Sequence, residues 1–313
     1  MSAPMRLFVE NGRFEIDPTE PGADESPRIQ QPLGEPVNGL VAVTDDFASI
    51  RTGVREGNVL LDVRLVDTEP ALNTDGWDET VDTTFTSTTG FARAGSYEHA
   101  LDLNIAHRGP GTYRLRLYAA GRDTDPGAIR RRNAKPVEHY LLHVWPAPAA
   151  PETVHKATDT VGRSLRVRLA AMAERGATWS LDDWIGPLTL RVPDGTFSLQ
   201  DPDAPARPHP AGLLSVEKDW ALISTGAGPG PVTVTLHPAG RDPHPDPLPW
   251  DQITEGVVRS TTGHLVLCTA DGPTKDYEDV ALHGPRQYGI RVHARHTAAG
   301  ADFLVQTWMH GKK

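Results

Sequence analysis

The sequence predicts a mainly β protein with two tandem, duplicated antiparallel β-sandwich domains and a short helical insert between them. Three observations lead to this prediction: a long internal repeat, apolar residues at every second position, and an abundance of Gly and Pro. The 313 residues include 29 Gly and 28 Pro, which favours many turns between short strands over long helices. A chain of this length has room for two ordinary domains and a connector.

The repeat relates the two halves of the chain at a constant offset. Segment 39–53, GLVAVTDDFASIRTG, and segment 212–226, GLLSVEKDWALISTG, are identical at eight of 15 positions without a gap. The offset (212 − 39 = 173) persists to the tetrapeptide STTG, found at 87–90 and again at 260–263. We therefore expect an internal duplication in which both halves have the same fold.

Within each copy the apolar residues recur with a period of two. In segment 113–119, YRLRLYA, positions 113, 115 and 117 are apolar or aromatic and alternate with Arg114 and Arg116. This period is typical of half-buried strands, and Gly/Pro turns between such strands favour an antiparallel sandwich. Four tryptophans in paired positions are expected to be structural core anchors, with a ligand-binding platform as the alternative: Trp77, Trp145, Trp250 and Trp308.

The chain divides into four expected regions: an N-terminal strand and loop (1–38), sandwich copy 1 (39–150), a linker with short helices and a hairpin (151–210), and sandwich copy 2 (211–313). Within the linker, 163–175 has helical spacing, Ser180 with Asp183 predicts a second short helix, and 188–199 predicts a hairpin. This order is similar to a truncated winged helix. One helix is lacking, so a solvated helix face is favoured over DNA binding for segment 156–199.

The charge of the chain is unevenly distributed. The formal net charge is −10, from 41 acidic and 31 basic residues. Residues 1–150 hold 22 acids and 15 bases (22 − 15 = 7, hence −7), and the rest hold 19 acids and 16 bases, hence −3. An acidic surface argues against binding to nucleic acid or to an anionic membrane, and it suits a basic protein partner. Without a signal peptide or a membrane-length apolar stretch, we expect a soluble cytoplasmic protein.

No motif indicates catalysis, a metal site or a cofactor. The only cysteine, Cys268, lies in an apolar strand and is expected to be buried and inert. Four histidines near the end of the chain lack metal-site spacing: His264, His283, His293 and His296. Of these, His293 is expected to be exposed, because it alternates with Ile290 and Val292. The sequence also lacks GxSxG and phosphate-loop motifs. An enzyme is therefore disfavoured, although a hydrolase with an unfamiliar site stays an alternative.

Acidic residues of the first copy are the candidate partner-binding groups. They flank its first strands and the turn at Trp77: Asp45, Asp46, Asp62, Asp78, Glu79 and Asp82. Asp78 recurs as Asp251 in the second copy, so a structural role at a turn is also open for it.

Two runs in the first copy carry a family resemblance. GPGTYRLRLYAAGRD (109–123) and EHYLLHVWPAPAAPE (138–152) resemble a family of uncharacterised actinobacterial β-rich proteins, from which no functional residues can be carried over. The chain is also weakly similar to competence protein J, a small β-rich nuclease inhibitor, in its Trp-acid turn and its late Gly-x-Tyr strand. That similarity implies an acidic β domain that blocks a basic partner.

The sequence thus predicts a non-enzymatic binding protein, of the immunity or inhibitor type, that occupies a basic protein. A small-ligand or carbohydrate-binding module is the alternative, with Tyr118 as an exposed aromatic platform.

Overall fold

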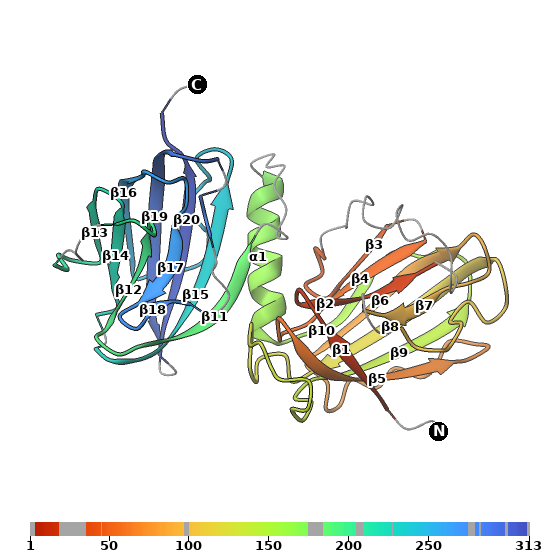
Figure 1. Cartoon of the computed structure of the whole chain (residues 1–313). Helices are drawn as coiled ribbons and strands as arrows, with labels where there is room; N and C mark the ends of the chain where they lie inside the picture. The colour runs from red at the N-terminus through yellow and green to blue at the C-terminus, as the bar shows by residue number, and fades with distance from the viewer. Residues whose placement is uncertain are drawn as a thin grey trace. The chain divides into compact units, whose positions relative to one another are not determined.

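The computed structural model divides the chain into two compact units, Met1–Ala177 and Thr178–Lys313. Each unit contains two β-sheets (Figure 1). The residues that the structure describes are 4–18, 36–44, 46–96, 100–174, 184–204, 209–226, 228–274, 279–281, 283–297 and 300–311.

The described residues of the first unit form a large sheet, a small sheet and one helix. The large sheet has the order β1 (Met5–Val9), β5 (Gly57–Leu65), β9 (His139–Pro146), β8 (Gly111–Ala120), β6 (Glu79–Ser87), β10 (Thr153–Ala157). The small sheet has the order β3 (Val41–Thr44), β4 (Phe47–Arg51), β2 (Arg13–Asp17), β7 (Arg93–Gly95). The helix α1 (Thr160–Glu174) follows β10.

In the part of the second unit that the structure describes, the strand order is the same but there is no counterpart of β10. Its large sheet runs β11 (Ile185–Val192), β15 (Gly230–Ala239), β20 (Gly300–Met309), β19 (Arg286–Thr297), β16 (Gln252–Ser260). Its small sheet runs β13 (Leu214–Glu217), β14 (Trp220–Ser224), β12 (Thr196–Gln200), β17 (Val266–Thr269), β18 (Gly272–Pro273). The sheets of the two units therefore correspond strand for strand, except at β10 and β18.

The predicted fold class is confirmed: the chain is mainly β, with two β-rich domains and a short helix between them in sequence. Most strand pairs are antiparallel, as expected. One pair in each large sheet is parallel, β5 with β9 and β15 with β20. Long connections make these parallel pairs possible, because a tight hairpin can join only antiparallel strands.

Alternation along the strands builds each core. Tyr113, Leu115 and Leu117 of β8 are buried together with residues of the small sheet in one apolar cluster. In the second unit Tyr288 and Ile290 of β19 belong to the equivalent cluster. The inward faces of both sheets thus meet as in an ordinary sandwich.

A buried tyrosine fixes the start of the same strand in both units. The Tyr113 hydroxyl donates to the Gly109 carbonyl at 2.7 Å and accepts a hydrogen bond from the Arg108 amide at 3.0 Å. The Tyr288 hydroxyl donates to the Gly284 carbonyl at 2.7 Å. This arrangement resembles the tyrosine corner of immunoglobulin-like sandwiches, in which the tyrosine ties a strand to the loop before it.

Three local expectations differ from the structure or lie outside it. The helix begins at Thr160, earlier than its apolar spacing predicts. The second short helix, at Ser180, falls outside the described residues. The predicted hairpin at 188–199 is wrong, because β11 pairs with β15 whereas β12 pairs with β14 and β17. The turn between β11 and β12 carries the chain from one sheet to the other. Both sandwiches therefore include a pair of strands N-terminal to the repeated segment.

The tryptophans divide into two kinds. Trp145 and Trp308 are buried, at 4% and 7% exposure. Trp77 and Trp250 are only half-buried and lie in the turns before β6 and β16. Each tryptophan therefore has a similar degree of burial to its counterpart in the other unit, but only Trp145 and Trp308 are buried.

No helix among the described residues is long and apolar enough to cross a membrane.

Removing the corner hydroxyl is expected to destabilise either unit. Tyr113→Phe and Tyr288→Phe each leave backbone groups without their partner, and the unfolding free energy should fall by about 1–3 kcal/mol. Urea unfolding followed by fluorescence measures the change. An unaltered transition in either variant would show that the corner is not a shared structural element.

Candidate partner-binding site

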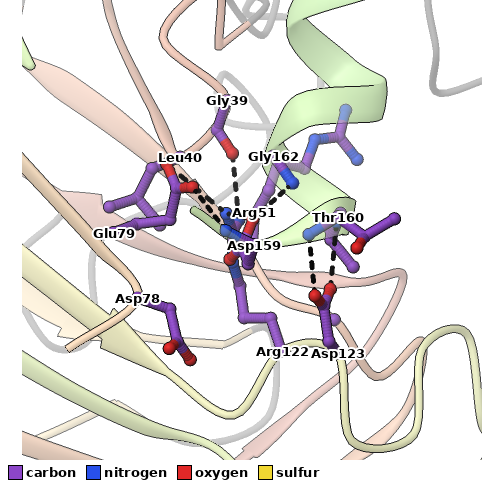
Figure 2. Close-up of polar contacts among 12 residues, drawn as sticks. Gly39, Leu40, Arg51, Asp78, Glu79, Arg122, Asp123, Asp159, Thr160 and Gly162 are labelled. Carbon is purple, nitrogen blue, oxygen red and sulfur yellow. Dashed lines mark hydrogen bonds and ion pairs between the residues drawn. The ribbon is translucent and has the colours of Figure 1, made fainter. Parts of the chain in front are cut away.

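The start of helix α1 is tied to the first unit by two aspartates (Figure 2). Asp159 immediately precedes the helix, and its Oδ1 accepts the Gly162 amide at 2.7 Å. Asp123 accepts the amides of Thr160 at 2.7 Å and Val161 at 3.1 Å. These carboxylates satisfy the free N–H groups of the first turn and complement the helix dipole.

Below this helix start lies a network of buried charges. The Arg122 guanidinium is fully buried and binds both oxygens of Asp159, at 2.6 and 2.9 Å. It also donates to the carbonyl of Gly39 at 2.9 Å. Arg166 of α1 donates to Glu79, the first residue of β6, at 2.8 Å. One helix, one strand and two loops are therefore held by bidentate or charge-assisted hydrogen bonds.

Burial governs the protonation of the acids in this network. Desolvation raises the pKa of Glu79, against the hydrogen bond from Arg166. Desolvation likewise raises the pKa of Glu138, which accepts the Gly53 amide at 3.0 Å and the Tyr140 hydroxyl at 2.6 Å. Perturbed acids are often catalytic. Here the side chains of Arg122 and Glu79 are 0% exposed and bonded within the fold, so the network is structural and a substrate has no access to it.

At the start of α1, the backbone at Gly39 and Gly162 lies very close to neighbouring atoms. A Cβ on Gly39 would lie 2.5 Å from Nη1 of Arg166 and 2.7 Å from the Gly162 carbonyl oxygen. A Cβ on Gly162 would lie 2.6 Å from Nη2 of Arg122. Gly39 also has φ of +85°, which disfavours other residues. Glycine at both positions lets α1 pack directly on the loop before β3.

On the outer face of the large sheet a second guanidinium organises a loop. Arg116 of β8 is 1% exposed and binds both oxygens of Asp82 on β6, at 2.7 and 2.8 Å. It also donates to the Pro70 carbonyl and to Glu69, each at 2.7 Å, and lies 5.4 Å from the Trp145 ring. The hydrogen bonds from Arg116 lower the pKa of Asp82, although its burial works against them.

The loop held by Arg116 is residues 66–78, which we name the acidic loop. It contains Asp67, Glu69, Asp75 and Asp78 and no basic residue. Its middle is exposed, with Leu72 at 47% exposure and the Glu69 side chain at 63%.

Further hydrogen bonds fix the rest of the acidic loop. Arg108 is bonded to Asp67, and Lys156 donates to the Thr74 carbonyl at 3.2 Å. The side chain of Asn73 accepts the Asp75 amide at 2.9 Å. At the C-terminal end, Asp78 accepts the Gly121 amide at 2.8 Å. The loop has no regular secondary structure, yet it is anchored at both ends and in the middle.

The second unit repeats the anchor around Arg291. This residue of β19 binds Glu255 at 2.6 Å, the Pro243 carbonyl at 2.5 Å and Asp242 at 3.2 Å, and lies 5.0 Å from the Trp308 ring. The loop it holds, residues 239–251, includes Arg241 and His244 beside three acids. The same frame therefore presents a less acidic loop in the second unit.

Two expectations about the outer face are wrong. Tyr118 is 1% exposed and packs against Trp77, 5.3 Å between ring centroids, so it is no exposed platform. His293 is 0% exposed and bonds Gln306 at 3.0 Å. Alternation along a strand predicts which side a residue faces. The loop that covers that side decides whether the residue is exposed.

Cys268, His264 and His296 have different surroundings, and no three His, Cys, Asp or Glu side chains among the described residues form a group that could hold a metal ion. Burial of Cys268 is confirmed at 1% exposure and raises the pKa of its thiol to about 11, which makes it unreactive at neutral pH. His264 is exposed and pairs with Asp279 at 2.7 Å. His296 bonds the Thr225 carbonyl at 3.0 Å.

The structure does not gather the six sequence-predicted acids into one surface. Glu79 and Asp82 are buried in the ion pairs described above. Asp62 lies 3.3 Å from His139, and Asp46 accepts the Thr88 hydroxyl at 3.0 Å. Asp78 holds the Gly121 amide, and Asp45 is outside the described residues. Of this set only Asp78 belongs to the acidic loop, whose exposed acids Asp67, Glu69 and Asp75 the sequence analysis did not single out.

Comparison with known proteins adds little to this geometry. No protein-family model and no curated protein matches the chain. The crystal structure of ComJ from Bacillus subtilis, an inhibitor of the DNA-degrading activity of NucA, is similar at 16% identity and a TM-score of 0.30, over 46% of this chain and 95% of that one. A structure titled crocagin biosynthetic gene J is similar at 14% identity and a TM-score of 0.28, over 47% and 97%. The weak similarity to competence protein J that the sequence predicts is therefore confirmed.

Breaking the buried network is expected to destabilise the first unit strongly. Asp159→Asn removes the charge that binds the Arg122 guanidinium through both oxygens and leaves Glu79, at 4.0 Å, as its carboxylate neighbour, so the unfolding free energy should fall by about 3–5 kcal/mol. Arg163→Ala changes an exposed residue of the same helix and should alter stability by less than about 0.5 kcal/mol. Thermal unfolding followed by circular dichroism compares the two. Equal melting temperatures would contradict the structural role of the network.

The neutral state of His143 should make stability depend on pH. Burial, with help from Arg64 and Arg116, lowers the pKa of His143 to about 4. The unfolded chain, with a histidine pKa of about 6.5, therefore binds the proton more readily. The unfolding free energy should fall as pH drops from about 6.5 towards 4.

The variant His143→Gln provides the test, because Gln306 occupies the equivalent place opposite Arg291. It should flatten the pH dependence in that window when urea unfolding is measured at each pH. An unchanged slope would mean that other groups cause it.

Proposed function

We propose that the protein is a non-enzymatic binding protein whose acidic loop, residues 66–78, occupies a basic partner protein. The observation that carries this proposal is that the acidic loop contains an exposed leucine, Leu72, together with several acids, and that hydrogen bonds to the rest of the first unit fix the loop in place. The proposal includes an immunity or inhibitor role for the protein and a cytoplasmic location.

The anchoring favours binding because it removes an entropic cost. A mobile loop must be ordered when it binds, and each immobilised side chain costs about 0.5–1.5 kcal/mol. The hydrogen bonds from Arg116 to Pro70 and Glu69 have already fixed the loop. A loop that is already ordered by hydrogen bonds loses less entropy on binding than a mobile linker would. We therefore assign this loop a binding role.

The chemistry of the loop favours a basic partner. Tight protein interfaces have an apolar anchor at their centre and a polar rim. Leu72 fits the anchor, and Asp67, Glu69 and Asp75 fit the rim. Carboxylates on one side raise the association rate of a positively charged partner. The two units carry the same formal net charge, −5 in residues 1–177 (25 acids, 20 bases) and −5 in residues 178–313 (16 acids, 11 bases), so the acids of the loop itself, and not the overall charge, favour contact through the first unit.

We further infer that the two units are duplicated copies with divided roles. The matched strand order, corner tyrosines and buried arginines support common descent. Since the equivalent loop of the second unit contains Arg241, it is less suited to a basic partner. The binding role is therefore assigned to the first copy alone.

The experiment compares charge reversal inside and outside the acidic loop. Wild type, Asp75→Lys and the control Asp271→Lys, which changes an exposed acid of the second unit, are immobilised and exposed to lysate of the source organism. A partner retained by wild type and the control is identified by mass spectrometry, purified and studied by surface plasmon resonance. Asp75→Lys should slow its association several-fold, and added salt should slow the wild type, since charges are screened over about 8 Å at physiological ionic strength.

Leu72→Asp tests the apolar anchor separately. It should speed dissociation and weaken binding about tenfold or more, because a buried anchor is worth more than about 1 kcal/mol. Circular dichroism checks that each variant is folded. The proposal is falsified if Asp75→Lys binds as the Asp271→Lys control does and Leu72→Asp binds as wild type does.

A further inference from the structure

The two large sheets differ at one edge. In the first unit β10 pairs antiparallel with the first half of β6, residues Glu79 to Asp82. In the second unit the strand equivalent to β6 is β16, and it pairs with β19 on its other side (Figure 1). Among the described residues no strand pairs with the outer side of Gln252–Glu255. Within its described residues, the second unit thus has an open sheet edge where the first has a strand.

Exposure confirms that this edge is uncovered within the described part of the second unit. On β6, beside β10, Thr80 is 0% and Asp82 5% exposed. The equivalent residues by the repeat offset are Ile253 (80 + 173), 47% exposed, and Glu255 (82 + 173), with its side chain 55% exposed. The far end of β16 is covered, because the Asp219 amide donates to the Arg259 carbonyl at 2.9 Å.

The backbone at the open end is arranged to accept a strand. The N–H and C=O groups of successive residues point to opposite sides of a strand. Since the Arg259 carbonyl points away from β19, the same groups of Val257, Glu255 and Ile253 do so too. Unpaired groups of this kind are a template for another strand, and proteins usually protect them with Lys, Pro or a bulge. The segment Gln252–Glu255 contains neither Lys nor Pro.

The charge at the edge indicates what the added strand carries. Glu255 and Asp242 share the single guanidinium of Arg291, so one negative charge remains in excess. In the first unit the equivalent acid, Asp82, has a further polar neighbour on the added strand, the imidazole of His155, at 3.2 Å. Lys156 follows it on β10. The edge of β16 therefore lacks the imidazole or positive charge that β10 supplies to β6.

We propose that the edge at Gln252–Glu255 binds an extended segment of a partner protein as an added antiparallel strand, with a histidine or basic residue opposite Glu255. This mode uses main-chain hydrogen bonds for affinity and alternate side chains for specificity. The site lies in the second unit and does not depend on the acidic loop.

The test uses a peptide with the sequence of residues 151–159, PETVHKATD, labelled with fluorescein and titrated with the full chain. We expect saturable binding by fluorescence anisotropy. A peptide with glutamate in place of the histidine should bind about tenfold more weakly, because it sets like charges opposite each other. Leu72→Asp, which alters the acidic loop, should bind the peptide as wild type does.

Variants at Ile253 locate the site. Ile253→Pro removes an outward N–H but no bond of the β16–β19 ladder, so the chain should stay folded and lose the peptide. Ile253→Thr keeps the N–H and the β-branched shape and should retain binding. Ile253→Lys keeps the N–H, repels a basic strand and should weaken binding, which provides the test if the proline variant does not fold.

Two results would overturn the proposal. One is the absence of saturable binding, or equal binding by wild type, Ile253→Pro and Ile253→Lys. The other is a dimer of the wild-type chain in analytical ultracentrifugation that Ile253→Pro converts to monomer, since a second copy would then occupy the edge in place of a partner segment.

Discussion

Each large sheet depends on a guanidinium buried in its outer face. Arg116 and Arg291 each bind a carboxylate on the neighbouring strand and a proline carbonyl in the loop above. A buried cation is costly when any of its partners is removed. If the loop left the sheet, the buried guanidinium would lose a hydrogen-bond partner and the fold would be destabilised. The outer face of the sheet would also become exposed to solvent. One interaction closes the sheet and also gives an irregular loop a single conformation.

A second layer of charge distinguishes the first unit from the second. Glu79 at the start of β6 is buried against Arg166 of the helix, whereas Gln252 at the same place is exposed. Gly39 and Gly212 both have positive φ. Only Gly39 is crowded by the helix, since a Cβ on Gly212 would meet nothing within 4 Å. The first unit thus has a strand and a helix that the described part of the second unit lacks, and Glu79 accepts hydrogen bonds from both Arg166 of the helix and the Asp159 amide before it.

The sequence predicted the sandwiches because period-two patterns and the repeat are local signals. A second, shorter repeat relates the strands that precede the main one. Segment 5–17 and segment 188–200 share Leu, Val, Gly and Phe at an offset of 183 (195 − 12), which adds two strands to each copy. The offset differs from 173 because the following loop differs in length. By contrast, the Arg122–Asp159 pair joins residues 37 apart in unrepeated segments, and no local pattern predicts such a tertiary contact.

Counting acids in the sequence therefore overstates the charge that a partner can meet. Glu79 and Asp82 lie within a few ångströms of arginines inside the fold, and the field of such a pair falls off faster than that of a single charge. Asp67 and Glu69 also have arginine partners, although their side chains remain 68% and 63% exposed. Asp75, three positions after Leu72 in the same loop, adds an exposed carboxylate. Because screening limits each charge to about 8 Å at physiological ionic strength, the position of the few outward acids decides where a basic partner is attracted. Among the described residues of the first unit, the acidic loop contributes three exposed acids, Asp67, Glu69 and Asp75, and others lie elsewhere, at Asp102, Asp123, Glu152 and Glu174.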